Sequence, residues 1–206
     1  MQTLEKDDVH AFNEQWKDVE SRYNPAVITL ERVKPPAGVI AHIHFTVDLS
    51  KKHHPVTDQP SMLYAHRAND PNLFTVSKVE GDVDILEGFP ETRPRVRFHS
   101  DCIPFHINVF ASGGMCIGNS DLTVLSIMFD NIFRALIYDP DPSVANYDSV
   151  ANRETIEWQQ EKEQSKEFPI LNPQLLFRQS AIGLPPVIVK AKSAVTTAPA
   201  LAPIRR

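Results

Sequence analysis

The sequence predicts a single α+β domain, and the order of its hydrophobic patterns is the main reason. The chain has 206 residues, 42% of them hydrophobic, which is enough for one well-buried core. Apolar residues recur first at helical spacing, then alternate as they do in strands, and later return to helical segments. A helix, antiparallel strands and further helices, in that order, make up an α+β layout.

The N-terminal segment is expected to be a helix over residues 3–21. Its apolar residues recur at intervals of three and four and form one stripe: Val9, Phe12, Trp16, Val19 and Tyr23. Pro25 ends this helix, because the residue before a proline avoids helical backbone angles. Strands are expected next over residues 26–33 and 41–49, and the second of them alternates apolar with polar residues.

The middle of the chain is expected to complete an antiparallel strand meander. Residues 50–73 are polar and contain three prolines, which indicates a long loop or an irregular hairpin. Residues 74–89 and 95–100 carry strand patterns.

Two helices are expected in the C-terminal half of the chain. Residues 122–138 are nearly all apolar, too long for a strand, and follow Ser120-Asp121, a pair suited to cap a buried helix. The Asp-Pro-Asp-Pro run at 139–142 would break that helix. A polar helix is expected over residues 148–167, with its packing stripe formed by Val150, Ala151, Thr155 and Trp158.

Charge separates the expected domain from its C-terminal end. The net charge is −5, but residues 168–206 hold five Lys or Arg and no acid, so residues 1–167 carry −10. An acidic body repels a phosphate backbone, so we expect no nucleic-acid partner. We expect a domain over residues 1–168, followed by a Pro/Ala-rich basic extension over 169–206 that is partly disordered.

Cysteine usage and hydropathy lead to expectations about the compartment. Two cysteines and no charged-then-apolar leader favour reduced thiols and a cytoplasmic location. No apolar run approaches the roughly 20 residues of a membrane-spanning helix, so no membrane partner is expected.

The segment FHINVFASGGMCI, residues 105–117, is where the chemistry is expected. Gly113-Gly114 lets the backbone turn sharply and keeps the sulfur of Cys116 open to a large partner. A thiolate is intrinsically nucleophilic and accepts an acyl group from a thioester without a tight Cys-His dyad. The Asn108 amide could donate to a carbonyl oxygen that gains negative charge, and such a donor can be worth roughly 3 kcal/mol or more. Cys102 has no such context and is expected to be a packed thiol.

FPETRPRVRF followed by HINVFASGGMCI resembles the signature of ubiquitin-conjugating (UBC) enzymes. That signature runs Tyr-Pro-x-x-Pro-Pro-x-Val-x-Phe, His-Pro-Asn and Gly-x-Ile-Cys-Leu, with the Asn-to-Cys interval of eight residues that separates Asn108 from Cys116. The convincing likeness covers residues 85–160. In this sequence Ile107 and Arg93 replace two of the family's prolines, the family's Trp-Ser-Pro after the Cys is absent, and the first helix is acidic. These departures resemble divergent bacterial members.

The resemblance implies a UBC-like fold with an N-terminal helix, an antiparallel strand meander, a Cys-bearing active-site loop and C-terminal helices. It implies an enzyme that accepts a ubiquitin-like modifier from an activating enzyme as a thioester on Cys116 and passes it to a target amine. Asn108 would stabilise the oxyanion or brace the loop, and His106 would hydrogen-bond the local backbone. An acid after the buried helix, Asp139 or Asp141, would assist the amine.

The expected partners are therefore proteins: the activating enzyme, the modifier, the target and, in some systems, a ligase. No cofactor is expected, because ATP is consumed by the activating enzyme. The gene neighbourhoods of the divergent bacterial members imply a role in antiphage defence.

Other functions remain as alternatives. A catalytically silent UBC-fold scaffold would bind a modifier or partner, although such members generally lose the Cys. A papain-like cysteine hydrolase would need His99 or His106 as its base, and in that class the base follows the nucleophile. No metal site is expected, because His42 and His44 fall on the polar face of their strand, where exposure to solvent explains them.

Overall fold

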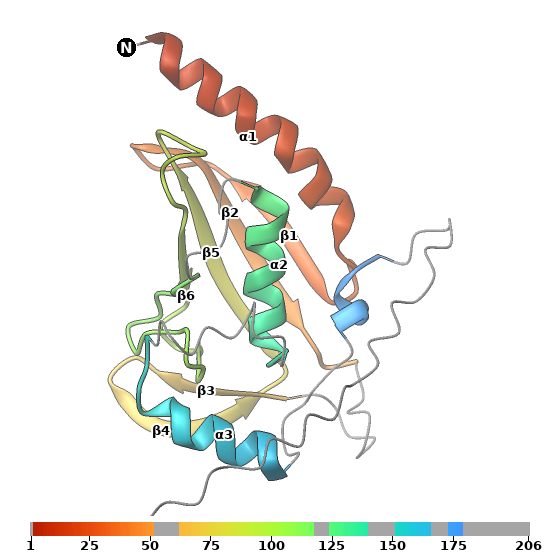
Figure 1. The fold of residues 1–206 in the computed structure, drawn as a ribbon, viewed down its shortest axis with the longest axis vertical. Helices are drawn as coiled ribbons and strands as arrows, with labels where there is room; N and C mark the ends of the chain where they lie inside the picture. Colours follow the sequence, from red (N-terminus) through yellow and green to blue (C-terminus); the bar gives the residue numbers. More distant parts are fainter. Residues whose placement is uncertain (1, 52–61, 118–123, 140–150, 166–172, 179–206) are drawn as a thin grey trace, which may run out of the picture.

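The computed structural model describes residues 2–51, 62–117, 124–139, 151–165 and 173–178 (Figure 1). It shows an N-terminal helix, two antiparallel sheets and further helices, so the predicted α+β class is confirmed. In chain order the elements are α1 (Gln2–Arg22), β1 (Ile28–Val33), β2 (Val39–Asp48), β3 (Leu63–Arg67), β4 (Asp70–Val76), β5 (Lys78–Leu86), β6 (Arg95–Phe98), β7 (Ile103–Pro104), α2 (Leu125–Leu136), α3 (Thr155–Ser165) and the 3₁₀ helix η1 (Pro173–Leu176).

The main sheet has the strand order β1-β2-β5-β6, with every pair antiparallel. Along β2 and β5, buried residues alternate with half-exposed ones, because successive side chains of a strand point to opposite faces. One face therefore belongs to the core, and α2 lies across that face (Figure 1), where the ring centroids of Phe45 and Phe133 are 5.7 Å apart. The other face carries polar side chains.

A second, smaller sheet has the order β4-β3-β7, with β3 and β4 inserted in the chain between β2 and β5 and with β7 following β6. The strands β3 and β4 form a hairpin with a register shift between Ala65 and Arg67. The irregular hairpin expected within residues 50–73 is thus confirmed from residue 63 onward, while residues 52–61 lie outside the described residues.

The predicted helical stripe of α1 supplies much of the contact with α2. Its buried members are Phe12, Trp16, Val19 and Tyr23, whereas Val9 is 38% exposed and does not belong to the core. The ring centroids of Trp16 and Phe129 are 6.3 Å apart, and those of Tyr23 and Phe133 are 5.0 Å apart. Both pairs meet edge to face, a favourable geometry for aromatic rings.

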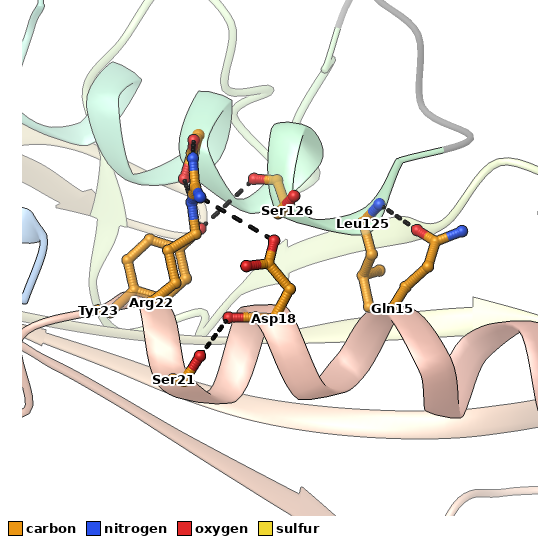
Figure 2. Close-up of polar contacts among 8 residues, drawn as sticks. Gln15, Asp18, Ser21, Arg22, Tyr23, Leu125 and Ser126 are labelled. Atoms are coloured by element: carbon orange, nitrogen blue, oxygen red, sulfur yellow. Dashed lines mark hydrogen bonds and ion pairs between the residues drawn. The ribbon is translucent and has the colours of Figure 1, made fainter.

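The start of α2 differs from the prediction. The helix begins at Leu125 after Val124, whose side chain makes no capping hydrogen bond, so Ser120-Asp121 is not its N-cap. The backbone N–H of Leu125 instead donates to Oε1 of Gln15 at 2.6 Å (Figure 2). A side chain from α1 therefore satisfies one of the N–H groups that a helix start leaves unpaired.

The end of α2 is also set by the backbone before the predicted Asp-Pro break is reached. Tyr138 has a φ of +54°. Its N–H donates to the carbonyl of Ala135 at 2.9 Å, and that of Asp139 donates to Arg134 at 3.0 Å. These two hydrogen bonds and the left-handed backbone of Tyr138 form a Schellman motif, an arrangement that ends a helix.

Residues 173–178, which the sequence assigned to the C-terminal extension, pack on the end of α1. Leu176 is fully buried, and its carbonyl accepts a 2.8 Å hydrogen bond from Asn24. The ring of Phe177 stacks on Tyr23 with centroids 5.8 Å apart. This part of the expected extension therefore contributes to the core.

The helix α3 begins at Thr155, later than the predicted residue 148. Residues 151–154 are described and are not helical, because the N–H groups of Ala151 and Asn152 donate to the carbonyl of Ile107 at 2.8 and 3.0 Å. Of the predicted stripe, Thr155 is buried and Trp158 is partly buried against the core, while Val150 lies outside the described residues. None of the helices in the described ranges is long and apolar enough to cross a membrane.

Candidate active site around Cys116

Residues 108–116 form a short hairpin that brings Asn108 and Cys116 together. The N–H of Cys116 donates to the carbonyl of Asn108 at 2.7 Å, and the N–H of Phe110 donates to that of Gly114 at 2.8 Å. Val109 and Met115 form an antiparallel bridge between these two bonds. The predicted pair Asn108 and Cys116 thus occupies opposite positions at the open end of the hairpin.

The returning arm of this hairpin is held by the main sheet. The N–H of Phe98 donates to the carbonyl of Gly113 at 2.8 Å, and the N–H of Met115 donates to that of Val96 at 3.0 Å. The arm therefore lies beside β6 as an irregular continuation of the sheet. A loop fixed to a sheet in this way gives its side chains a defined position.

Gly113 is the residue that makes the turn possible. Its φ is +90°, and a Cβ at this position would lie 2.9 Å from the carbonyl oxygen of Phe98. A residue with a side chain is therefore both strained and crowded here. Gly114 has no positive φ, and its Cβ would meet a Phe110 ring carbon at an ordinary 3.6 Å. Of the two glycines named from the sequence, only the first is required by the backbone.

The two cysteines differ in their surroundings. Both are half-buried, and they do not form a disulfide. Cys102 lies directly before β7, its Sγ donates to the carbonyl of Lys78 at 3.7 Å, and it packs against the core as predicted. Burial, with a smaller contribution from Asp101, raises the pKa of the Cys102 thiol to about 11. Since the thiolate is the nucleophile, Cys102 is a poor one at neutral pH.

The side chain of Asn108 is buried with an oxygen that lacks a partner. The residue is 2% exposed, and within the described part of the chain its Oδ1 accepts no hydrogen bond. A buried unpaired polar atom costs about 1–3 kcal/mol, so this amide does not lie in its most stable possible environment. Polar groups held in this way need an explanation, and catalysis is one of the recognised explanations.

His106 takes the structural role predicted for it. The imidazole is 2% exposed, and its Nδ1 accepts a 3.1 Å hydrogen bond from the N–H of Asn108, so the ring carries its proton on Nε2. Burial lowers the pKa of His106 to about 4. The ring is therefore neutral at physiological pH and acts as a hydrogen-bond acceptor for the segment that carries Asn108.

The acidic residues named from the sequence are only partly described. Asp139 is 6% exposed, and its Oδ2 accepts a 2.6 Å hydrogen bond from Nε of Arg134. Its carboxylate thus forms an ion pair at the C-terminal end of α2. Asp141 lies outside the described residues.

A second group of polar side chains lies on the outer face of the main sheet. One ligand atom each from His44, Asp82 and His99 lie within 4.8 Å of one another, so these residues could hold a metal ion. His42 and His44 do occupy the polar face, but their side chains are 23% and 29% exposed and bond to carboxylates. They thus contact both solvent and carboxylates, and the absence of a metal site stays a prediction. Asp82 and His99 were not predicted from the sequence. A signal existed for Asp82, because Asp82 and Asp84 are two residues apart, as are His42 and His44.

Comparison with known proteins does not assign a family. No family model matches the sequence, and a search of curated proteins gives no significant match. The residues and geometry of the chain itself are therefore the basis for proposing a function.

Proposed function

We propose that this chain is a ubiquitin-conjugating-like enzyme, which accepts a ubiquitin-like modifier as a thioester on Cys116 and transfers it to a target amine. The observation that carries the proposal is the hydrogen bond of 2.7 Å between the N–H of Cys116 and the carbonyl of Asn108. This backbone hydrogen bond places the residue that carries the thiol opposite the residue that carries the amide, in a hairpin that turns at Gly113. The eight-residue interval from Asn108 to Cys116 is also the interval in the UBC signature that this segment resembles.

The order of the elements supports this proposal. The resemblance implies a helix, a strand meander, a Cys loop, a buried helix and a closing helix. The chain has α1, the sheet β1-β2-β5-β6, the hairpin 108–116, the buried helix α2 and then α3. The hairpin β3-β4 is an addition between the second and third strands of the main sheet.

The first reaction step is a thioester exchange. The thiolate of Cys116 attacks the carbonyl carbon that joins the modifier to a cysteine of the activating enzyme. A new carbon–sulfur bond forms, the old one breaks, and the activating enzyme leaves as a thiolate. The exchange replaces one thioester by another, so it needs no general base as strong as that of a cysteine protease.

The second step transfers the modifier to an amine. A neutral amine attacks the thioester carbonyl, negative charge develops on the oxygen, and collapse of the intermediate expels Cys116 as a thiolate while the amine proton passes to solvent. An amide donor from Asn108 would stabilise the oxygen at this stage. Asp139 is already paired with Arg134, which leaves Asp141 as the acidic residue proposed to orient the amine.

The geometry weighs against the hydrolase alternative. A cysteine hydrolase needs an imidazole that takes the thiol proton. Nδ1 of His106 already accepts the Asn108 N–H, and its pKa of about 4 makes the ring a weak base. His99 precedes Cys116 in the chain, whereas in papain-like hydrolases the base follows the nucleophile.

The proposal is tested by reconstituting the first step. The protein is mixed with ATP, a matched activating enzyme and a ubiquitin-like modifier, and the products are separated on a gel. We expect an adduct that disappears with reducing agent, is absent in Cys116→Ala and persists in Cys102→Ala. If the protein binds the modifier but forms no adduct, the scaffold alternative is correct. Cleavage of a modifier fusion by the protein alone would support a hydrolase.

The role of Asn108 is tested by measuring two rates separately. Loading is the formation of the thioester on Cys116, and discharge is the transfer of the modifier from Cys116 to lysine. If the amide stabilises the oxyanion, Asn108→Ala should load at nearly the wild-type rate, while discharge to lysine falls by roughly 10² to 10³. If the residue braces the hairpin, the variant should lose both loading and free energy of unfolding. Equal discharge rates for variant and wild type would remove Asn108 from the mechanism.

A further inference from the structure

The register of the main sheet brings histidines and carboxylates together on its outer face. His44 of β2 pairs with Asp82 of β5, and His42 pairs with Asp84. All four belong to the half-exposed set of their strands, opposite the buried set that faces α2. His99 follows β6 directly, and its N–H donates to the carbonyl of Glu80 at 3.2 Å. Three separate stretches of the chain thus contribute to one cluster.

The donor atoms in this cluster already have the spacing of metal ligands. Nδ1 of His44 lies 3.1 Å from Oδ1 of Asp82, and Nε2 of His99 lies 3.4 Å from Oδ2 of the same carboxylate. A tetrahedral zinc ion with bonds of about 2.0–2.1 Å sets its ligand atoms about 3.3 Å apart. The two contacts end on different oxygens of Asp82, but one ligand atom from each of the three residues lies within 4.8 Å of the other two, so a single ion could join them after side-chain movements.

The surrounding charges leave Asp82 available for a cation. Among the described residues, the basic partners within 4 Å of Asp82 are imidazoles: His42, His44 and His99. The nearby cations Lys78 and Arg95 contact other carboxylates, those of Glu80 and Asp84. Arg97 is the cross-strand partner of Asp82 but forms no ion pair with it within 4 Å among the described residues. The Asp82 carboxylate, which lies within 4 Å of three imidazoles, can accept a metal ion without breaking an ion pair to Lys or Arg.

His42 adds an arrangement that is common beside metal ions. Its Nδ1 lies 2.6 Å from Oδ1 of Asp84, while its Nε2 lies 3.6 Å from Oδ1 of Asp82. The Asp84 carboxylate therefore orients the His42 ring so that its other nitrogen faces Asp82, while His42 itself is not one of the grouped ligands. The pair His42 and Asp84 therefore supports the cluster from one side.

The cluster is open to solvent on its other side. The side chains of His44, Asp82 and His99 are 29%, 31% and 40% exposed. Asp82 and His99 also line a surface hollow of about 760 Å³ together with Ser112 and Gly114 of the Cys116 hairpin. An ion can enter from solvent, and water has room to complete its coordination.

We propose that His44, Asp82 and His99 bind one divalent transition-metal ion, with zinc as the preferred ion and water at the fourth position. Two imidazoles and one carboxylate are borderline ligands that suit zinc better than magnesium or calcium. The ion would connect β2, β5 and the end of β6, the strand on which the Cys116 hairpin rests. The site is independent of the proposed thioester chemistry and goes beyond it.

Metal binding is tested on the full chain after treatment with a chelator. Titration with zinc chloride in a calorimeter is expected to give one ion per chain, and cobalt(II) is expected to give the visible absorption of a tetrahedral site. His44→Gln, Asp82→Asn and His99→Gln should each weaken zinc binding at least tenfold. The matched control is His10→Gln, which removes an exposed histidine of α1 and should bind zinc like the wild type.

A second control addresses the adjacent pair His53-His54, which could bind zinc by itself. The double variant His53→Gln/His54→Gln should keep one ion per chain, and loss of the ion in this variant would overturn the proposal. Wild-type protein that binds no zinc, or ligand variants that bind it as tightly as the wild type, would also overturn it. Should a ligand variant fail to fold, the wild type still gives a test: zinc must shift the imidazole NMR signals of His44 and His99, and unchanged signals would contradict the assignment.

Discussion

Lowering the pH from 7.5 to 5.0 is expected to destabilise the fold through His106 by about 2 kcal/mol. The ordinary pKa of 6.5 applies in the unfolded chain, whereas burial lowers the pKa to about 4 in the fold. Between these values the unfolded state binds a proton that the folded state excludes, so stability falls as the pH falls through this window. The loss is complete below pH 4, where it reaches about 3 kcal/mol at 1.36 kcal/mol per pKa unit.

The measurement is urea unfolding of the wild type and of His106→Gln at both pH values. Glutamine does not titrate, and its side-chain oxygen can still accept the Asn108 N–H. Every other titrating group is common to both proteins, so the difference between their pH dependences isolates the imidazole. We expect the wild type to lose about 2 kcal/mol more than the variant between pH 7.5 and 5.0.

Equal losses in the two proteins would refute this reasoning. They would mean that the imidazole takes up its proton equally well in the folded and unfolded states. His106 would then not be a buried neutral acceptor, and its exclusion as the base of a hydrolase would no longer hold.

Three further predictions concern the hairpin, the thiols and the C-terminal end. Gly113→Ala should lower the free energy of unfolding by about 1–3 kcal/mol, because residue 113 has a positive φ and a Cβ there would crowd the carbonyl oxygen of Phe98. In the same urea experiment, Gly114→Ala should change the free energy of unfolding by less than about 1 kcal/mol. Iodoacetamide at pH 8 should label Cys116 well before Cys102, whose raised pKa keeps it protonated, and faster labelling of Cys102 by mass spectrometry would contradict this. Leu176→Ala should cost about 2–5 kcal/mol, because the side chain is fully buried, and a wild-type melting curve would show that residues 173–178 do not belong to the core.

The spacing of apolar residues within a segment was sufficient to predict the elements that pack through a helical stripe or an alternating strand face. The stripe of α1 predicted the burial of Phe12 and Trp16, and the alternation in β2 predicted which of its faces is buried. The predicted helix starts were wrong where a residue distant in the sequence determines the residue at which the helix begins. Gln15 of α1 caps α2, and the carbonyl of Ile107 holds the residues before α3, and neither contact has a local signal.

The candidate sites follow the same division. Asn108 and Cys116 lie eight residues apart in one hairpin, so the resemblance of this short segment to the UBC signature was enough to name them together. The cluster of His44, Asp82 and His99 depends on which strands become neighbours and on their register. That pairing is a property of the whole sheet, and the sequence of each strand showed only a polar face.

The most direct test of the central claim is to locate the bond between the modifier and this protein. Cys116→Ser should trap the modifier as an ester that survives reducing agent, because the serine oxygen replaces the thiolate sulfur. After incubation with the activating enzyme, modifier and ATP, tandem mass spectrometry of the digested adduct is expected to find the modifier on residue 116. Attachment at Cys102 or at a lysine in place of residue 116 would contradict the account.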